Sequence, residues 1–217
     1  MKEKIVPKGQ NAEKIIIALN KSYPGARTAL DFSGAMELLV ATVLSAQCTD
    51  ERVNKVTAGI FKKYKTAKDY ASADANIFSE EIRSLGLFRS KAKNIIAAAK
   101  IIDEKYRGRV PSTMDRLVAL PGIARKTANI ILHSAFKKNE GIAVDTHVRR
   151  LSRRIGLTKN EFPDKIERDL MAIIPKRYWG KTNTLLVVHG RSICTARKPK
   201  CGKCVIEKFC RYPDKEF

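Results

Sequence analysis

Four of the chain's five cysteines lie close together, in the pattern C-x6-C-x2-C-x5-C. Thiolates bind soft metals, and a cytosolic compartment keeps thiols reduced, so the array predicts a metal site and not a pair of disulfides. Zinc sites usually show two C-x2-C pairs, whereas a cubane iron–sulfur cluster also takes four cysteines. The spacing favours a cluster over zinc only narrowly. The predicted ligands are Cys194, Cys201, Cys204 and Cys210.

The segment between the first two of these cysteines is basic and carries Arg197, Lys198 and Lys200. A metal site that fixes this loop would present rigid cations to phosphate groups. The fifth cysteine, Cys48, stands apart from the array. We interpret it as a small thiol in or near the core that has no pairing partner.

The segment from Leu120 to Asn129 reads LPGIARKTAN. A short helix is expected to end at Leu120, Pro-Gly to form a tight turn, and a new helix to begin almost at once. The unpaired N–H groups at such a helix start form a site for one phosphate. This is the helix-hairpin-helix arrangement, which grips a nucleic acid backbone without reading its sequence. The Lys-Thr pair resembles the end of a P-loop, but Arg125 stands where that motif needs glycine, so we exclude ATP binding.

Lys126 falls in the first turn of the second helix of this hairpin. The positive end of the helix macrodipole and the adjacent Arg125 favour the neutral amine, the form that attacks a sugar carbon and makes a Schiff base. In so basic a chain, however, a single lysine is more often a solvated surface group. Asp145 precedes another predicted helix and is expected to cap it, which would fix its carboxylate. The neighbouring His147 is expected to serve structure or phosphate contact, not catalysis.

Apolar residues at helical spacing must position these groups, because period-two alternation and hairpin turns are scarce. The predicted fold class is therefore all-α. One helix should be buried on all sides, and another should begin after Thr49 as its N-cap. A capping box of Ser112 and Asp115 should open a short helix that ends at Leu120. The expected helices span 35–46, 50–64, 90–107, 113–120, 125–136, 146–155, 164–174 and 179–192.

The 217 residues include 43 Lys and Arg against 22 Asp and Glu, a formal net charge of +21. The basic residues are spread along the whole chain, which favours a broad face for a polyanion. Nucleic acid is preferred over an anionic membrane surface or a solvated lysine coat. The longest apolar stretch, residues 38–46, is too short to span a bilayer, and no signal peptide follows the basic start. We expect a cytoplasmic protein that is not secreted.

Five segments together resemble the endonuclease III family of DNA glycosylases with AP-lyase activity, in the family's order and spacing. The resemblance implies a two-lobed, all-α helix-hairpin-helix DNA glycosylase fold. It implies a six-helix barrel domain at residues 28–138 and an iron–sulfur cluster domain formed by residues 1–27 and 139–217. The matching segments are LLVATVLSAQCTD (38–50), SLGLFRSKAKNI (84–95), VALPGIARKTAN (118–129), VDTHVRRLSRRIGL (144–157) and VVHGRSICTARKPKCGKC with a later Cys (187–210).

The resemblance also implies roles for the site residues. Lys126 would attack C1′ of the deoxyribose and expel the damaged base, while Asp145 would accept a proton or stabilise positive charge on the sugar. The imine on Lys126 would then permit β-elimination of the 3′ phosphate. The four cysteines would hold a [4Fe–4S] cluster. Gln47 and Leu87 would fill the gap left by the extruded nucleotide. Further DNA contacts would come from Leu120, Pro121, Gly122, Ile123, Ala124, His147, Arg197, Lys198 and Lys200.

The implied function is removal of oxidised or saturated pyrimidines from double-stranded DNA and nicking at the abasic site, by a monomer associated with the nucleoid. Relatives that act on mispaired adenine or thymine lack the lysine, so Lys126 disfavours a mismatch-directed glycosylase. A non-catalytic, zinc-stabilised module that only binds DNA is the alternative from another class. Ala124 departs from the second hairpin glycine of many relatives, and alanine is compatible there if its φ is negative.

Overall fold

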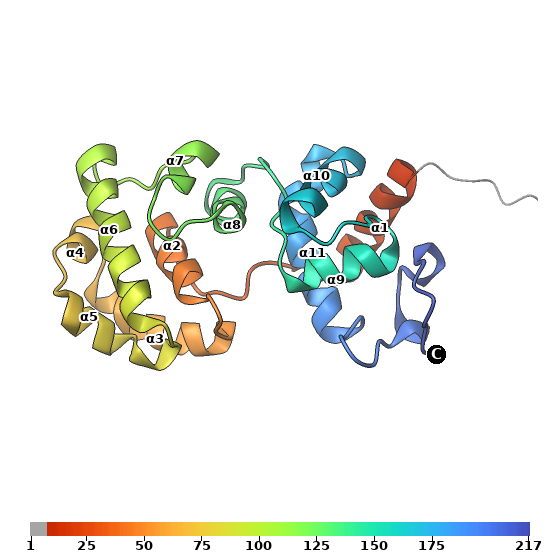
Figure 1. The fold of residues 1–217 in the computed structure, drawn as a ribbon, viewed down its shortest axis with the longest axis horizontal. Helices are drawn as coiled ribbons and strands as arrows, with labels where there is room; N and C mark the ends of the chain where they lie inside the picture. The colour runs from red at the N-terminus through yellow and green to blue at the C-terminus, as the bar shows by residue number, and fades with distance from the viewer. Residues whose placement is uncertain (1–7) are drawn as a thin grey trace, which may run out of the picture. The chain divides into compact units, whose positions relative to one another are not determined.

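The computed structural model describes residues 8–217, which are helical and contain no β-strand (Figure 1). The chain divides into two compact units. One comprises residues 28–137, and the other joins residues 8–27 to residues 138–217. The expected boundary, after residue 138, differs from this division by one residue. No helix among the described residues is long and apolar enough to cross a membrane.

Helix α2 (Ala35–Leu44) forms the centre of the unit of residues 28–137. Its residues 38–44 are buried without interruption, because the segment is apolar on all sides. It contacts α3 (Asp50–Lys63), α6 (Phe88–Tyr106) and α8 (Arg125–Phe136). The unit also contains α4 (Ala67–Ala71), α5 (Ala75–Glu81), the 3₁₀ turn η1 (Arg83–Leu85) and α7 (Met114–Val118).

Helix α6 packs its predicted apolar face against α2, α4 and α5, with Ile95 and Ile102 fully buried. It begins at Phe88, two residues before the predicted start at Ser90. The reason is Leu87, which has left-handed backbone dihedrals (φ 48°, ψ 25°) and stands at the N-cap position. The chain therefore turns sharply just before the helix.

Side-chain capping follows the prediction at α3 and departs from it at α4 and α7. Thr49 caps α3, since its hydroxyl accepts from the backbone N–H of Arg52 at 3.3 Å. The predicted capping box at Ser112 is wrong, because α7 begins after Thr113 and that side chain makes no capping hydrogen bond. A capping box occurs instead at α4, between Thr66 and Asp69, where it was not predicted.

The second unit contains α1 (Lys8–Ser22), α9 (Thr146–Ile155), α10 (Pro163–Ile173) and α11 (Trp179–Ser192). Helix α1 packs on α10 and α11, and α9 also packs on both. A segment far away in sequence therefore completes this core. The 3₁₀ turn η2 (Lys176–Tyr178) precedes α11, and η3 (Cys201–Lys203) and η4 (Glu207–Phe209) follow it.

Helices α8, α9 and α11 have the predicted bounds, and the predicted inward face of α9 is confirmed by the burial of Val148, Leu151 and Ile155. Helix α10 begins one residue early, at Pro163. Proline is well suited to that first position, where its missing N–H would have no partner within the helix.

Candidate functional site

The hairpin between α7 and α8 is anchored by two apolar side chains. Leu120 and Ile123 are 2% and 4% exposed, and the Ile123 N–H donates to the Leu120 carbonyl at 3.1 Å. The buried side chains of these two residues therefore fix the turn to the core of its unit. The Leu120 N–H also donates within the protein, to the Leu117 carbonyl at 3.0 Å, so these two residues position the turn and a phosphate would be bound by the donors of its other residues. Pro121 is half-buried and Ala124 is exposed.

The geometry of the turn requires glycine at position 122. Gly122 has φ 78°, and a Cβ there would lie 2.9 Å from the Cβ of Asn94 on α6. Ala124, by contrast, is the N-cap of α8 with φ −85°, so the departure from a second glycine costs nothing in backbone strain. Its methyl group caps no N–H, which leaves the first turn of α8 suited to an anion.

Lys126 is the second residue of α8 and is exposed within its unit. Asp145 belongs to the other unit, where it is the N-cap of α9 as predicted. Its Oδ1 accepts the backbone N–H of Val148 at 2.8 Å. The capping bond fixes the carboxylate on a rigid helix and leaves it half-buried, so that it can still receive a proton or face a positive charge.

Gln47 and Leu87 are both exposed, and both have left-handed backbone dihedrals, with φ 57° and φ 48°. Each such non-glycine residue costs on the order of 1 kcal/mol. No residue type in either segment indicates this strain. Leu87 is 57% exposed, so its side chain is available to another molecule.

Cys48 lies beside Gln47 and is a free cysteine, as predicted, but hydrogen bonds link it to a second loop. Its Sγ donates to the Leu85 carbonyl at 2.6 Å. The buried Lys91 donates to the same carbonyl and lies 3.6 Å from the sulfur. Sequence reasoning missed Lys91 because a lysine on an amphipathic helix is expected in solvent.

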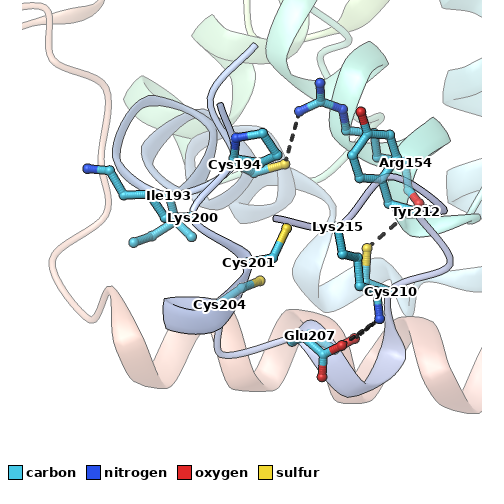
Figure 2. A pocket seen from close by; sticks show the side chains of 11 residues that line it. Arg154, Ile193, Cys194, Lys200, Cys201, Cys204, Glu207, Cys210, Tyr212 and Lys215 are labelled. Atoms are coloured by element: carbon cyan, nitrogen blue, oxygen red, sulfur yellow. Dashed lines mark hydrogen bonds and ion pairs between the residues drawn. The ribbon is translucent and has the colours of Figure 1, made fainter. Parts of the chain in front are cut away.

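The four cysteines of the array line one pocket, which Arg154, Tyr212 and Lys215 also border (Figure 2). Among residues 8–217, no group of three His, Cys, Asp or Glu side chains is arranged to hold a single metal ion. A cubane cluster places four irons at separate corners, each bound by one thiolate. Four thiols that line one pocket are the donor set that such a cluster takes.

Burial changes the acidity of two of the four thiols. It raises the pKa of Cys204 to about 11, and it also raises the pKa of Cys210 above its usual range. These two groups therefore stay protonated at neutral pH without a metal, and a positively charged metal core would be needed to hold them as thiolates.

Two arginines of α9 support the basic loop that begins at Cys194. Arg154 donates to the Thr195 and Ala196 carbonyls, each at 2.7 Å, and its Nη1 lies 3.6 Å from the Cys194 sulfur. Arg150 donates to the Cys194 carbonyl at 3.0 Å. Two of the basic residues of α9 thus serve the protein's own structure, although the spread of basic residues along the chain predicted a broad binding face.

The three cations of this loop, Arg197, Lys198 and Lys200, are exposed, while Pro199 between them is buried. His147 lies in the first turn of α9 with its Nδ1 3.2 Å from Nη2 of Arg150. The loop therefore has a fixed base and charged side chains that reach solvent, as a phosphate-binding loop requires.

His189 of α11 adds a contact to the metal pocket that sequence reasoning missed. It is 1% exposed, and burial lowers its pKa to about 4, so the ring is neutral. Its Nδ1 lies 2.9 Å from the Tyr23 hydroxyl and its Nε2 lies 3.3 Å from the Cys204 sulfur. A neutral ring that accepts from the tyrosine donates to the sulfur, which stabilises a thiolate there.

Two family models match the chain. One, described as HhH-GPD superfamily base excision DNA repair protein, covers residues 40–176. The other, described as iron-sulfur binding domain of endonuclease III, covers residues 194–210. The second range begins and ends at the outer cysteines of the array, which supports a [4Fe–4S] cluster as the cofactor.

Curated relatives and solved structures agree with these models. The chain is 50% identical over 207 residues to endonuclease III of Synechocystis sp., covering 95% of this chain and 94% of the relative. It is 39% identical over 202 residues to endonuclease III of Escherichia coli, covering 93% and 95%. A structure of a trapped endonuclease III–DNA covalent intermediate matches with a TM-score of 0.88 at 41% identity, covering 95% of this chain and 97% of the other. A thermostable thymine-DNA glycosylase shares the fold, with a TM-score of 0.83 at 23% identity.

Proposed function

Because the chain belongs to the endonuclease III family of base-excision repair DNA glycosylases, we propose that it removes oxidised or saturated pyrimidines from double-stranded DNA and nicks the strand at the resulting abasic site. The observation that carries the proposal is the place of Lys126. Its exposed amine lies in the first turn of α8, directly after a hairpin whose backbone donors suit a phosphate. A rigid helix therefore fixes the position of the amine relative to the proposed phosphate-binding hairpin.

In the proposed reaction the Lys126 amine forms a bond to C1′ of the deoxyribose while the bond from C1′ to the base breaks. The departing base takes the electron pair and a proton, the sugar ring opens, and an imine joins Lys126 to C1′. Loss of a C2′ proton then expels the 3′ phosphate, and water hydrolyses the imine to restore the lysine. The homologous endonuclease III trapped as a covalent intermediate with DNA supports this route.

Asp145 is proposed to stabilise the positive charge that develops on the sugar, or to accept the proton that the lysine loses. Its bond to the Val148 N–H holds the carboxylate in one orientation. A charge placed in advance lowers a barrier without reorganisation during the reaction. A carboxylate that also caps a helix meets this requirement.

We further propose that DNA is held by two phosphate-binding elements, the hairpin of residues 120–124 and the loop of residues 195–200, with His147 as an additional contact. Cys194, Cys201, Cys204 and Cys210 would hold the [4Fe–4S] cluster, which fixes the fold of that loop. The same proposal assigns residues 28–138 to a six-helix barrel domain and residues 1–27 and 139–217 to an iron–sulfur cluster domain. We also propose that the protein acts as a monomer, on the DNA of the nucleoid in the cytoplasm.

Borohydride trapping on a duplex with one abasic site tests the imine. Wild-type protein is expected to become covalently attached to the DNA, and Lys126→Ala is expected to lose all attachment while it keeps its affinity for the duplex. Lys137→Asn is the matched control, since Lys137 is an exposed lysine at the other end of α8 in a left-handed position that asparagine tolerates. Undiminished trapping of Lys126→Ala would show that another amine is the nucleophile.

A further inference from the structure

Lys91 is a lysine with almost no contact with solvent. It is 4% exposed and lies at the end of the first turn of α6, and a buried charged side chain is costly unless it is hydrogen-bonded. Its Nζ donates to the carbonyl oxygens of Leu44 and Leu85, each at 2.8 Å. Such a costly group persists where its hydrogen bonds hold something in place.

The two carbonyls belong to two different loops. Leu44 is the last residue of α2 and leads into the turn that carries Gln47. Leu85 is the last residue of η1 and leads into the turn that carries Leu87. Cys48 adds a second link between them, from its Sγ to the Leu85 carbonyl at 2.6 Å. One ammonium and one thiol therefore join the bases of both loops.

Each of these two loops holds one non-glycine residue with left-handed backbone dihedrals. Among the described non-glycine residues with positive φ, Arg107 and Lys137 are the C-caps of helices, an ordinary place for that conformation. Gln47 and Leu87 have no such reason. Strained dihedrals persist only where the surroundings fix them, and the links through Lys91 and Cys48 supply that constraint.

We propose that Lys91, together with Cys48, is a positioning residue for extrusion of the damaged nucleotide, because it fixes the loops that present Gln47 and Leu87 to the duplex. The inference rests on the proposed function. Lys91 itself touches no substrate. It acts by keeping two exposed side chains at one spacing, so that both can enter the space that the extruded nucleotide leaves.

The proposal separates two kinds of substrate. A lesion within a stable base pair must be unstacked and unpaired, which costs a few kcal/mol, whereas an abasic site lacks the base that resists extrusion. Loss of the link should therefore slow base release from a paired lesion much more than it slows nicking at an abasic site. A merely destabilised protein would lose both activities together.

Two single-turnover rates are measured for Lys91→Met. One is base release from a duplex with 5,6-dihydrouracil opposite guanine, and the other is nicking of a duplex of the same sequence with an abasic site in place of the lesion. A 2-aminopurine beside the lesion reports unstacking by its fluorescence. Base release and the fluorescence change are expected to fall about tenfold or more, with nicking within about twofold of wild type. Lys93→Met is the matched control, since Lys93 is exposed on the same helix, and it should resemble wild type in both assays.

Cys48→Ala, which removes the second link, should show the same selective loss at about two- to fivefold, and Cys48→Ser, which keeps a donor, should restore it. If Lys91→Met does not fold, equal base-release rates for these two variants overturn the proposal. Equal loss of base release and nicking in a folded Lys91→Met, or no loss in either, also overturns it. A wild-type protein that nicks abasic DNA but releases no base from the lesion overturns the proposed function itself.

Discussion

The hairpin of residues 120–124 and the loop of residues 195–200 are both proposed to hold phosphates, yet different interactions fix them. The hairpin depends on two buried apolar side chains and on one glycine against Asn94. The loop depends on guanidinium groups of α9 and on the cysteines that border the metal pocket. The hairpin is fixed by its local sequence and by core packing. The loop is fixed by arginines that are distant in sequence and, as proposed, by the cluster. The second should therefore be the one that fails when the metal is lost.

The largest expected effect is that of Cys204→Ala, which removes one proposed ligand. A structural metal site contributes on the order of 10 kcal/mol to folding, so we expect loss of iron and of ordered structure over residues 194–217. Hydrogen exchange should show unchanged protection in residues 28–137. Equal loss of protection in that unit would break the comparison, because the hairpin would then depend on the metal as well.

Gly122→Ala should disturb the hairpin and leave the cluster in place. The positive φ and the 2.9 Å approach to Asn94 together should cost about 2–4 kcal/mol and weaken binding to abasic DNA more than tenfold. Gly59→Ala is the matched control, since a Cβ there meets nothing within 4 Å, and it should stabilise α3 by about 0.5–1 kcal/mol. Urea unfolding, DNA titration and iron content measure the three quantities. Loss of iron from Gly122→Ala would contradict this separation.

Arg154→Met should sharpen the comparison from the other side. It deletes the donors to the Thr195 and Ala196 carbonyls, at a cost of about 2 kcal/mol, with faster loss of iron to a chelator and little change in hairpin protection. Arg153→Met is the matched control. Arg153 pairs with Glu161 at the surface at 2.8 Å, and such exposed pairs contribute less than about 1 kcal/mol. Similar rates of iron loss for the two variants would count against the role of Arg154.

The smallest expected effect on stability is that of Asp145→Ala, which loosens the first turn of the helix that carries both supporting arginines. Loss of this N-cap should cost about 1 kcal/mol, whereas Asp145→Asn should keep most of the capping energy. Both variants should slow base release strongly, because neither retains the negative charge. Full activity in Asp145→Asn would remove the carboxylate from the proposed chemistry.

The sequence predicted helices well where an apolar period ended in a clear signal. Helix α9 begins directly after Asp145 as expected, because N-cap chemistry is local and needs no knowledge of the fold. Helix α8 begins where the Pro-Gly turn predicted it. The start of α6 was misplaced because Leu87 adopts a left-handed conformation that no leucine suggests. Such strain is imposed by tertiary contacts, which a single sequence does not display.

The candidate site divides in the same way. The array of cysteines and the hairpin with Lys126 could be predicted, because their chemistry depends on spacing along the chain. The buried Lys91 and the contact between His189 and Cys204 could not. The hydrogen bonds of both side chains join residues that are distant in sequence. From sequence alone, a lysine is usually expected in solvent and a histidine in ordinary packing.

The packing of α1 against α10 and α11 has a consequence for the order of events during synthesis. Residues 28–137 are synthesised before α10 and α11, so that unit can begin to fold before α1 has its packing partners. The predicted cysteine ligands come later still. In a chain that never receives iron, the hairpin of residues 120–124 should therefore still form, because it depends on the first unit alone.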